Sequence, residues 1–247
     1  MSVIVIGYNS WHYLESCFAS LSFIQENADN EIIYVDNGST DNTVKEIKNH
    51  FPSVIIIENH KNLGISKARN HGIAQAKGEY LWLLDSDTET SREVCNTMLA
   101  FMDSHPEVGL CGCRLVGNNG KPQASCRRFP TISEKWNAMW RIILKRPKLD
   151  IQYDLEQTAP FRVDYVIGAC QMFRRMVLEK VGSLDEHFFF AEDADFCRRI
   201  TMAGYQIFYL PQVSMYHFYQ RVSTQKPFSK VSRKHLTDLI YYFWKWK

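Results

Sequence analysis

Two aspartates separated by one residue, Asp85 and Asp87, directly follow the apolar run at residues 80–84. A hard divalent cation such as Mg²⁺ or Mn²⁺ takes oxygen ligands from one or two carboxylates and completes its shell with substrate phosphates. This spacing therefore predicts a metal-assisted reaction on a phosphate-bearing substrate. The alternative is that both aspartates cap a helix beginning near Ser91, although Thr90 and Glu93 are already spaced as its capping box.

A second acidic pair, Glu192 and Asp193, follows three consecutive phenylalanines and begins a segment with helical spacing. The unpaired N–H groups at a helix N-terminus favour a charged carboxylate. Asp193 is therefore able to receive a proton from a hydroxyl group at neutral pH. The alternative is that Asp193 is only a helix N-cap. Asp195, two residues further on, is expected to support the structure.

Other polar side chains follow the strands expected at residues 3–6 and 31–35. Asp36 can accept a hydrogen bond from a base or a ribose, and Tyr8, beside Asn9, offers a ring on which a base can stack. The alternative for Asp36 is an Asx turn before Gly38.

His217 ends a short apolar and aromatic run. A neutral imidazole is a suitable third ligand for Mg²⁺ or Mn²⁺, and a purely structural histidine is an equally open alternative. Cys111 and Cys113 have no partner cysteine or histidine at zinc spacing, so we expect them to be core thiols.

The first hundred residues alternate between strand and helix patterns. Short apolar runs at 3–6, 31–35, 54–58 and 80–84 are each followed by a loop and an amphipathic segment. This alternation predicts an α/β fold with a mostly parallel, Rossmann-like sheet covered by helices on both faces. Ligands bind such sheets at the carboxyl ends of the strands, which is where the polar residues above are expected.

Beyond residue 104 the alternation weakens. We expect strands at 108–116, 122–128 and 163–173, and helices at 133–145, 175–181 and 194–203. No internal repeat or low-complexity linker interrupts the chain. The sequence therefore predicts one domain over residues 1–220 and a tail over residues 221–247.

Composition restricts the function classes. The 247 residues carry a net charge of only +2, which gives no electrostatic case for nucleic acid as a partner. Seven cysteines, scattered singly, favour a reduced, cytoplasmic compartment. The N-terminus lacks the positive region of a signal peptide, and no apolar stretch approaches the roughly 20 residues that span a bilayer. Any contact with a membrane is therefore expected at its surface.

The tail is basic and amphipathic. Residues 221–247 contain seven basic residues and one acid. Apolar residues fall on one side of the expected C-terminal helix (Leu236, Leu239, Ile240, Phe243 and Trp246), whereas Lys234, Asp238 and Lys245 fall on the other. Tryptophan and tyrosine mixed with lysine suit a helix lying at the inner-membrane surface. Packing of the apolar stripe on the rest of the chain is an equal alternative.

Together these segments resemble the family 2 glycosyltransferases of GT-A fold, and in particular their rhamnosyltransferase-like branch. The resemblance covers about residues 2–217 and departs from the common pattern at Ala191 and after His217, where a glycine is usual. It rests on five motifs in order: residues 3–9, 35–41, 62–64 with 68–70, 84–87 and 192–195.

This resemblance implies roles for individual residues. Asp87 would bind the metal, and Asp193 would be the general base of an inverting displacement. His217 is a candidate third metal ligand. Arg69 would approach the nucleotide, with a solvated arginine on a helix face as the alternative. The donor-binding residues are expected to be Tyr8, Asn9, Asp36, Arg69, Asp85 and Glu192.

We therefore predict an inverting, metal-dependent transferase that moves a sugar from a nucleoside diphosphate to a glycan or lipid-linked acceptor in bacterial cell-surface assembly. A dTDP-rhamnose donor is favoured only by the resemblance to the rhamnosyltransferase-like branch. A sugar-phosphate nucleotidyltransferase is one alternative, but no Gly-rich, basic loop follows the first strand. A non-catalytic nucleotide- or glycan-binding module is the other, and the joint presence of Asp87 and Asp193 argues against it.

Overall fold

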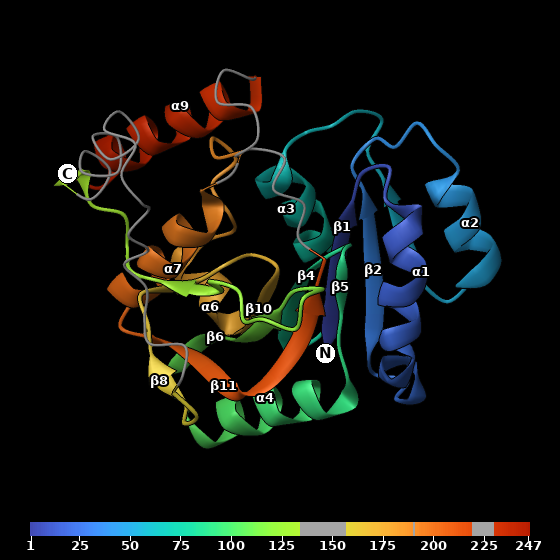
Figure 1. Ribbon diagram of the computed structural model, residues 1–247, viewed down its shortest axis with the longest axis horizontal. Coiled ribbons are helices and arrows are strands. Elements are labelled where there is room, and N and C mark those ends of the chain that lie inside the picture. The colour runs from blue at the N-terminus through green and yellow to red at the C-terminus, as the bar shows by residue number, and fades with distance from the viewer. Residues whose placement is uncertain (134–156, 190, 219–229) are drawn as a thin grey trace.

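The computed structural model describes residues 1–133, 157–189, 191–218 and 230–247 (Figure 1). One mixed sheet has the strand order β3-β2-β1-β4-β10-β6-β11-β5. Its strands are β1 (Ser2–Gly7), β2 (Glu31–Asp36), β3 (Ile55–Glu58), β4 (Tyr80–Asp85), β5 (Thr88–Glu89), β6 (Val108–Val116), β10 (Cys170–Arg174) and β11 (Gln206–His217), with β8 (Phe161–Arg162) beside β11. A separate pair joins β7 (Cys126–Arg127) to β9 (Tyr165–Val166).

The first four strands of the sheet confirm the predicted parallel arrangement. β1 lies between β2 and β4 and is parallel to both, and β3 is parallel to β2. The central residues of β1, β2 and β4 are almost fully buried because helices cover both faces, which explains the unbroken apolar runs in these strands. The register pairs Gly7 with Asp36 and Ile6 with Asp85, so these strand ends meet at one edge of the sheet.

The second half of the sheet is mixed. β10 is antiparallel to both β4 and β6, and β11 runs parallel to β6. The register between β11 and β6 shifts between Leu210 and Ser214. The last residues of β11 pair with β5, which sets His217 opposite Thr88 and brings the end of β11 to the strand ends of the parallel half.

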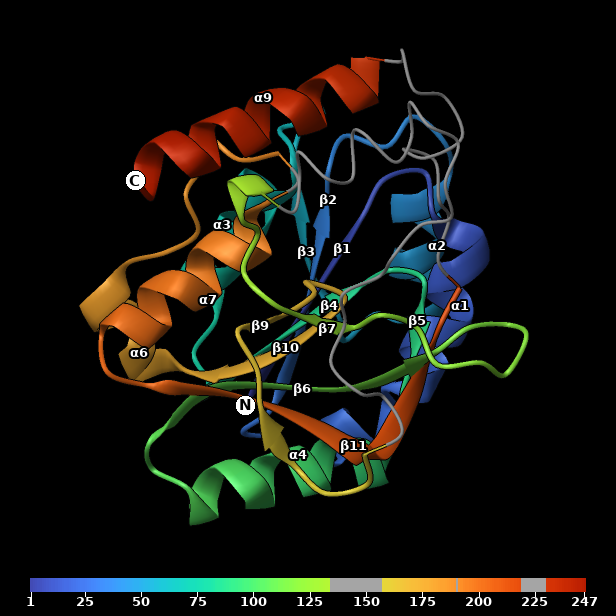
Figure 2. The same ribbon diagram turned by 60° about the vertical axis from the view of Figure 1, so that its left-hand side comes forward.

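Helices cover the two faces of the sheet. One layer contains α1 (Trp11–Ser20), α2 (Thr43–His50) and α4 (Arg92–Ser104), and the other contains α3 (Ile65–Gln75), α6 (Arg175–Val181) and α7 (Glu192–Met202). A short 3-10 helix spans Ser22–Glu26. The last helix, α9 (Lys230–Lys245), lies outside this second layer, over the side of the molecule that carries α7 (Figure 2).

Several sequence predictions need correction. The strand expected at 163–173 is broken into β9 and β10, and the chain turns at residues 167–169 between them. Of the strand expected at 122–128, only β7 and an isolated bridge from Pro122 to Val116 form. The cap of α4 is Ser91, whose hydroxyl accepts from the N–H of Val94, and not Thr90. Most of the helix expected at 133–145 lies outside the described residues.

Other expectations agree with the structure. The helix expected at 194–203 forms as α7, beginning two residues earlier. All seven cysteines are buried free thiols, so the interpretation of Cys111 and Cys113 as core residues is confirmed. Among the helices in the described part of the chain, none combines the length and apolar character that crossing a bilayer requires.

Candidate active site

Three side chains that could hold a metal ion converge at the carboxyl edge of the parallel strands. Asp85 ends β4, Asp87 precedes β5, and His217 ends β11. One ligand atom from each lies within 4.8 Å of the others, and Nε2 of His217 is 3.5 Å from Oδ1 of Asp87. The N–H of Phe218 donates to the carbonyl oxygen of Asp87 at 2.8 Å, which holds the end of β11 against this loop. The structure thus brings Asp87 and His217, the predicted metal ligands, together with Asp85, which the resemblance assigned to donor binding.

Gln123 fixes the orientation of the His217 ring. Its amide nitrogen donates to the carbonyl oxygen of His217 at 2.7 Å, and its amide oxygen lies 2.8 Å from Nδ1 of the His217 ring. Because an amide oxygen only accepts, we assign the ring hydrogen to Nδ1, which leaves Nε2 facing Asp87 as a lone-pair donor. A second partner that fixes the tautomer in this way is common for metal-binding histidines. Sequence analysis did not identify Gln123.

The electrostatics of the site fit a divalent cation. Burial and the neighbouring Asp85 carboxylate raise the pKa of Asp87. Two carboxylates this close repel each other, and a cation between them removes the repulsion. Carboxylate oxygens with one imidazole nitrogen form a donor set suited to Mg²⁺ or Mn²⁺.

Arg69 links the metal-site loop to the start of α7. Its guanidinium donates to Oδ1 of Asp85 at 2.7 Å, to Oε1 of Glu192 at 2.8 Å and to the carbonyl oxygen of Gly168 at 2.8 Å. Arg69 is only 1% exposed, so the alternative of a solvated arginine on a helix face is wrong. A buried cation requires such partners, and the two carboxylates are in turn held in place by it.

Gly168 provides the space that Arg69 needs. A Cβ built at this position would lie 2.2 Å from Nη1 of Arg69, which is far inside contact distance. Any side chain here would displace the guanidinium. The pattern at residues 163–173 predicts one continuous strand and does not mark Gly168, although a glycine inside a strand pattern is itself a signal of close approach.

Glu192 and Asp193 lie in the first turn of α7. Glu192 is 4% exposed, and burial and the Asp193 charge, opposed by Arg69, raise its pKa to about 8. The N-cap of α7 is Ala191, so the alternative that Asp193 is only an N-cap is wrong. Burial also raises the pKa of Asp193, although the N–H of Ala194 and the charge of Arg127 oppose it. Burial thus opposes the effect of the helix N-terminus, and a charged Asp193 at neutral pH stays a prediction.

Asn9 joins the loops that follow β1 and β2. It has a left-handed backbone with φ of 50°. Its N–H donates to the hydroxyl of Ser39 at 2.9 Å, and its Oδ1 accepts from the N–H of Thr40 at 2.8 Å. The neighbouring Tyr8 is 48% exposed, so its ring is accessible to a ligand. Asn9 thus orders the loops that present Tyr8.

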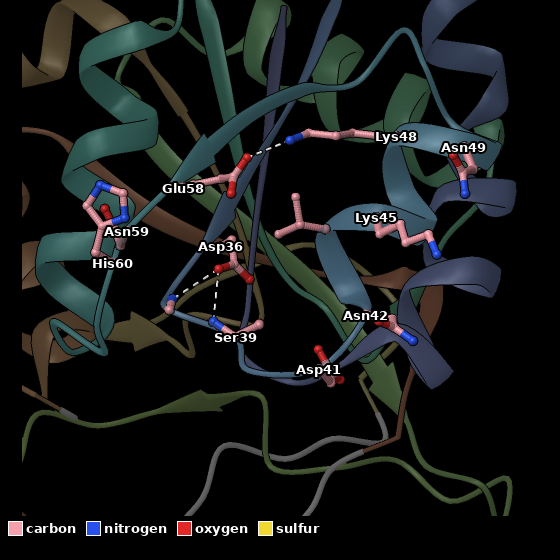
Figure 3. Close-up of a pocket in the computed structure, with 12 residues that line it drawn as sticks. Asp36, Ser39, Asp41, Asn42, Lys45, Lys48, Asn49, Glu58, Asn59 and His60 are labelled. Atoms are coloured by element: carbon pink, nitrogen blue, oxygen red, sulfur yellow. Dashed lines mark hydrogen bonds and ion pairs between the residues drawn. The ribbon is translucent and has the colours of Figure 1, made fainter.

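Asp36 is buried and forms hydrogen bonds within its own loop. Its Oδ2 accepts from the N–H groups of Gly38 and Ser39 at 3.1 and 2.9 Å, which is the turn that the sequence offered as an alternative. A cavity of about 570 Å³ opens beside it between α2 and the end of β3 (Figure 3). Neither Asp85 nor Asp87 lines this cavity, so it is separate from the metal site.

Asn37 is a third residue that sequence analysis missed. It is 6% exposed, and its Oδ1 accepts from the N–H of Leu63 at 3.0 Å. Its amide nitrogen donates to Asn62 and to the carbonyl oxygen of Gly64. Asn37 therefore fixes the loop that leads into α3, and α3 carries Arg69.

The candidate residues thus form two groups. Interactions within the described chain connect His217, Asp87, Asp85, Arg69 and Glu192 into one cluster, with Asp193 beside it. Tyr8, Asn9 and Asp36 lie at the neighbouring strand ends and make contacts to their own loops.

This arrangement of sheet and acidic site defines the class of GT-A proteins. The solved structure of S. aureus TarS 1-349 in complex with UDP-GlcNAc matches with a TM-score of 0.63 at 22% identity, over 89% of this chain and 58% of that one. That of GalNAc-T7 with UDP, GalNAc and Mn²⁺ matches with a TM-score of 0.66 at 17% identity, over 89% and 44%. At such identities these likenesses establish the fold.

Sequence comparison identifies the family. The profile of Glycosyl transferase family 2 matches residues 2–182, and the chain belongs to this family. A Mycobacterium tuberculosis protein named N-acetylglucosaminyl-diphospho-decaprenol L-rhamnosyltransferase is 26% identical over 98% of this chain and 83% of its own length. The predicted family and its rhamnosyltransferase-like branch are therefore confirmed.

Proposed function

We propose that the chain transfers a sugar from a nucleoside diphosphate to a hydroxyl of a glycan or lipid-linked acceptor, with inversion at the anomeric carbon. The observation that carries this proposal is the cluster in which Arg69 joins metal-site Asp85 to Glu192, the neighbour of Asp193. Groups suited to a leaving diphosphate and a group suited to an attacking hydroxyl therefore lie on one connected framework. The name of the mycobacterial relative, which specifies a diphospho-decaprenol acceptor, supports a lipid-linked acceptor. The proposal also includes a role in cell-surface assembly on the cytoplasmic side of the membrane.

Asp193 is the general base in this proposal. Its carboxylate takes the proton of the acceptor hydroxyl as that oxygen bonds to the anomeric carbon, while the bond from this carbon to the diphosphate oxygen breaks on the opposite face. Burial raises the pKa of Asp193, which strengthens it as a base toward a hydroxyl.

Asp85, Asp87 and His217 would hold Mg²⁺ or Mn²⁺, which neutralises charge on the departing diphosphate when bound. Arg69 and Glu192 position Asp85 and the start of α7. The exposed ring of Tyr8 stacks on the base, and Asn9 and Asp36 order the loops around the nucleoside. In this proposal residues 1–220 carry the chemistry, and residues 221–247 form an accessory tail.

A panel of nucleotide sugars with Mg²⁺ or Mn²⁺ tests the proposal, with release of nucleoside diphosphate as the readout and NMR of the product to assign the anomer. Asp87→Ala should abolish turnover and metal-dependent nucleotide binding. Asp193→Asn should lower turnover by about 100-fold or more and leave nucleotide binding nearly intact. Asp29→Asn, on an exposed loop, is the matched control and should behave as wild type.

Two results would contradict the proposal. Near wild-type transfer by Asp193→Asn would remove the base assignment. A folded protein that binds nucleotide sugars but releases diphosphate from none of them, with any acceptor tried, would favour the non-catalytic binding module. Transfer of a nucleotidyl group would instead favour the nucleotidyltransferase alternative, which family membership already disfavours.

A further inference from the structure

One side of α9 is fixed to the rest of the molecule by buried polar contacts. Asp238 is 1% exposed and accepts from the N–H of Phe189 at 2.8 Å. Lys245 donates to Asp185 and lies 2.7 Å from Asp195, a fully buried residue of α7. The indole N–H of Trp246 also donates to Asp195 at 3.0 Å. Asp195 thus has the structural role expected of it.

This arrangement corrects the predicted faces of the helix. The sequence pattern placed Asp238 and Lys245 on the outer, polar side, but both face the domain. The Phe189 N–H group donates to Asp238 there, and Asp185 and Asp195 balance the charge of Lys245. Tyr242 lies between them on the same side and is fully buried. The helix therefore packs on the domain, as one sequence alternative held.

The opposite side of α9 exposes a continuous apolar stripe. Leu236, Ile240 and Trp244 follow one another at four-residue intervals, so they align along one face of the helix. They are 60%, 62% and 64% exposed, which is unusual for large apolar side chains. Exposed Arg233 stands three residues before the stripe on the same side of the helix, and exposed Lys247 follows the stripe just beyond the end of α9. We call these five residues the outer stripe.

The charge of the tail matches an anionic surface. Asp238 is the only acidic residue in 221–247, and its side chain is buried against the domain. The outer stripe is therefore apolar at its centre and basic at both ends. Amphipathic helices of this kind, with tryptophan among the apolar residues, lie in the interface of bilayers that contain anionic lipids.

We propose that the outer stripe docks the protein on the surface of an anionic lipid bilayer while the inner side of α9 stays on the domain. Figures 1 and 2 show α9 along the margin of the molecule. Asp238 of α9 is hydrogen-bonded to the backbone of Phe189, which lies four residues before Asp193. Docking of α9 would therefore set the start of α7 close to the membrane. The proposal concerns binding and does not depend on the proposed transfer reaction.

Vesicle co-sedimentation of the full chain, without any substrate, tests this inference. Vesicles of equal parts phosphatidylglycerol and phosphatidylcholine should bind the protein at low salt and release part of it at high salt, and pure phosphatidylcholine should bind it at least tenfold less. Ile240→Glu with Trp244→Glu should lower binding to the anionic vesicles at least tenfold. Met176→Glu with Met202→Glu, which changes two exposed apolar residues on α6 and α7, is the matched control and should bind as wild type.

Brominated phosphatidylglycerol gives a second, local readout. It should quench part of the tryptophan fluorescence of the wild type, and Trp244→Phe should lose that part while still binding. Thermal unfolding confirms that each variant is folded. Equal binding to both vesicle types, or unchanged quenching in Trp244→Phe, would overturn the proposal. A wild-type dimer that Ile240→Glu with Trp244→Glu dissociates would assign the stripe to a second copy and would also overturn it.

Discussion

Gln123 makes two hydrogen bonds to His217: its amide oxygen accepts from ring Nδ1 at 2.8 Å, and its amide nitrogen donates to the backbone carbonyl oxygen at 2.7 Å. The first contact selects the tautomer, and the second keeps the amide from rotating. Gln123 lies before β7, far from β11 in sequence, so two segments cooperate to aim one nitrogen at Asp87.

We expect Gln123→Leu to weaken Mn²⁺ binding by about tenfold or more, because loss of an outer partner of a metal-binding histidine commonly has this effect. The measurement is the Mn²⁺ concentration that gives half-maximal nucleotide binding, followed together with the melting temperature. Gln206→Leu, at the far end of β11, serves as the control and should leave this concentration unchanged. Equal metal dependence in both variants would show that Gln123 has no part in the site.

Gly168→Ala should destabilise the protein through Arg69. The added methyl group would stand 2.2 Å from Nη1, and moving the guanidinium breaks its ion pair with Asp85 and its hydrogen bond to Glu192. Leaving a buried charge without its partners costs about 3–5 kcal/mol of unfolding free energy. Gly120→Ala is the control, because a Cβ at Gly120 would have no atom within 4 Å. Its positive φ alone should lower the free energy of unfolding by about 1 kcal/mol.

Urea unfolding measures this difference, and a double-mutant cycle with Arg69→Met identifies its cause. If Gly168→Ala acts by displacing Arg69, the two effects will fall well short of additive. Full additivity would mean that the alanine disturbs something other than the guanidinium.

Glu192 should make stability fall as pH rises. Its pKa is raised from an ordinary 4.5 to about 8 by burial first and by Asp193 second. Between these values the folded state keeps the proton and the unfolded state releases it, so the free energy of unfolding decreases by at most about 1.4 kcal/mol per pH unit. Glu192→Gln removes this group, and its stability should decline less across the same window. Urea unfolding at several pH values compares the two, and parallel profiles would contradict the assignment.

The sequence was informative where burial is continuous. β1, β2 and β4 were predicted because both faces of the sheet are covered, so that nearly every residue in these runs is apolar. The break between β9 and β10 was not predicted, because the chain turns at Gly168 to present a carbonyl oxygen to Arg69, and that partner comes from α3. A local pattern carries no record of a contact between such distant segments.

The same reasoning applies to the candidate site. The acidic residues stand out by type and spacing, and the structure brings Asp85, Asp87 and His217 together. Their supports, Gln123 and Gly168, are ordinary residues in loops and become visible only in three dimensions. The buried and exposed faces of α9 were predicted wrongly for a related reason. Lys245 faces the domain because it forms ion pairs with Asp185 and Asp195, which lie elsewhere in the chain.

β11, the last strand in the described part of the chain, has a consequence for biosynthesis. Chains are made from the N-terminus, so Asp85 and Asp87 leave the ribosome well before His217. Until β11 arrives, one edge of β6 has no partner strand in the sheet, and such open edges promote aggregation. A product of interrupted translation that stops before β11 would therefore lack both the third candidate metal ligand and the strand that covers β6. Completion of the candidate metal site and protection of the nascent sheet occur in the same late step of synthesis.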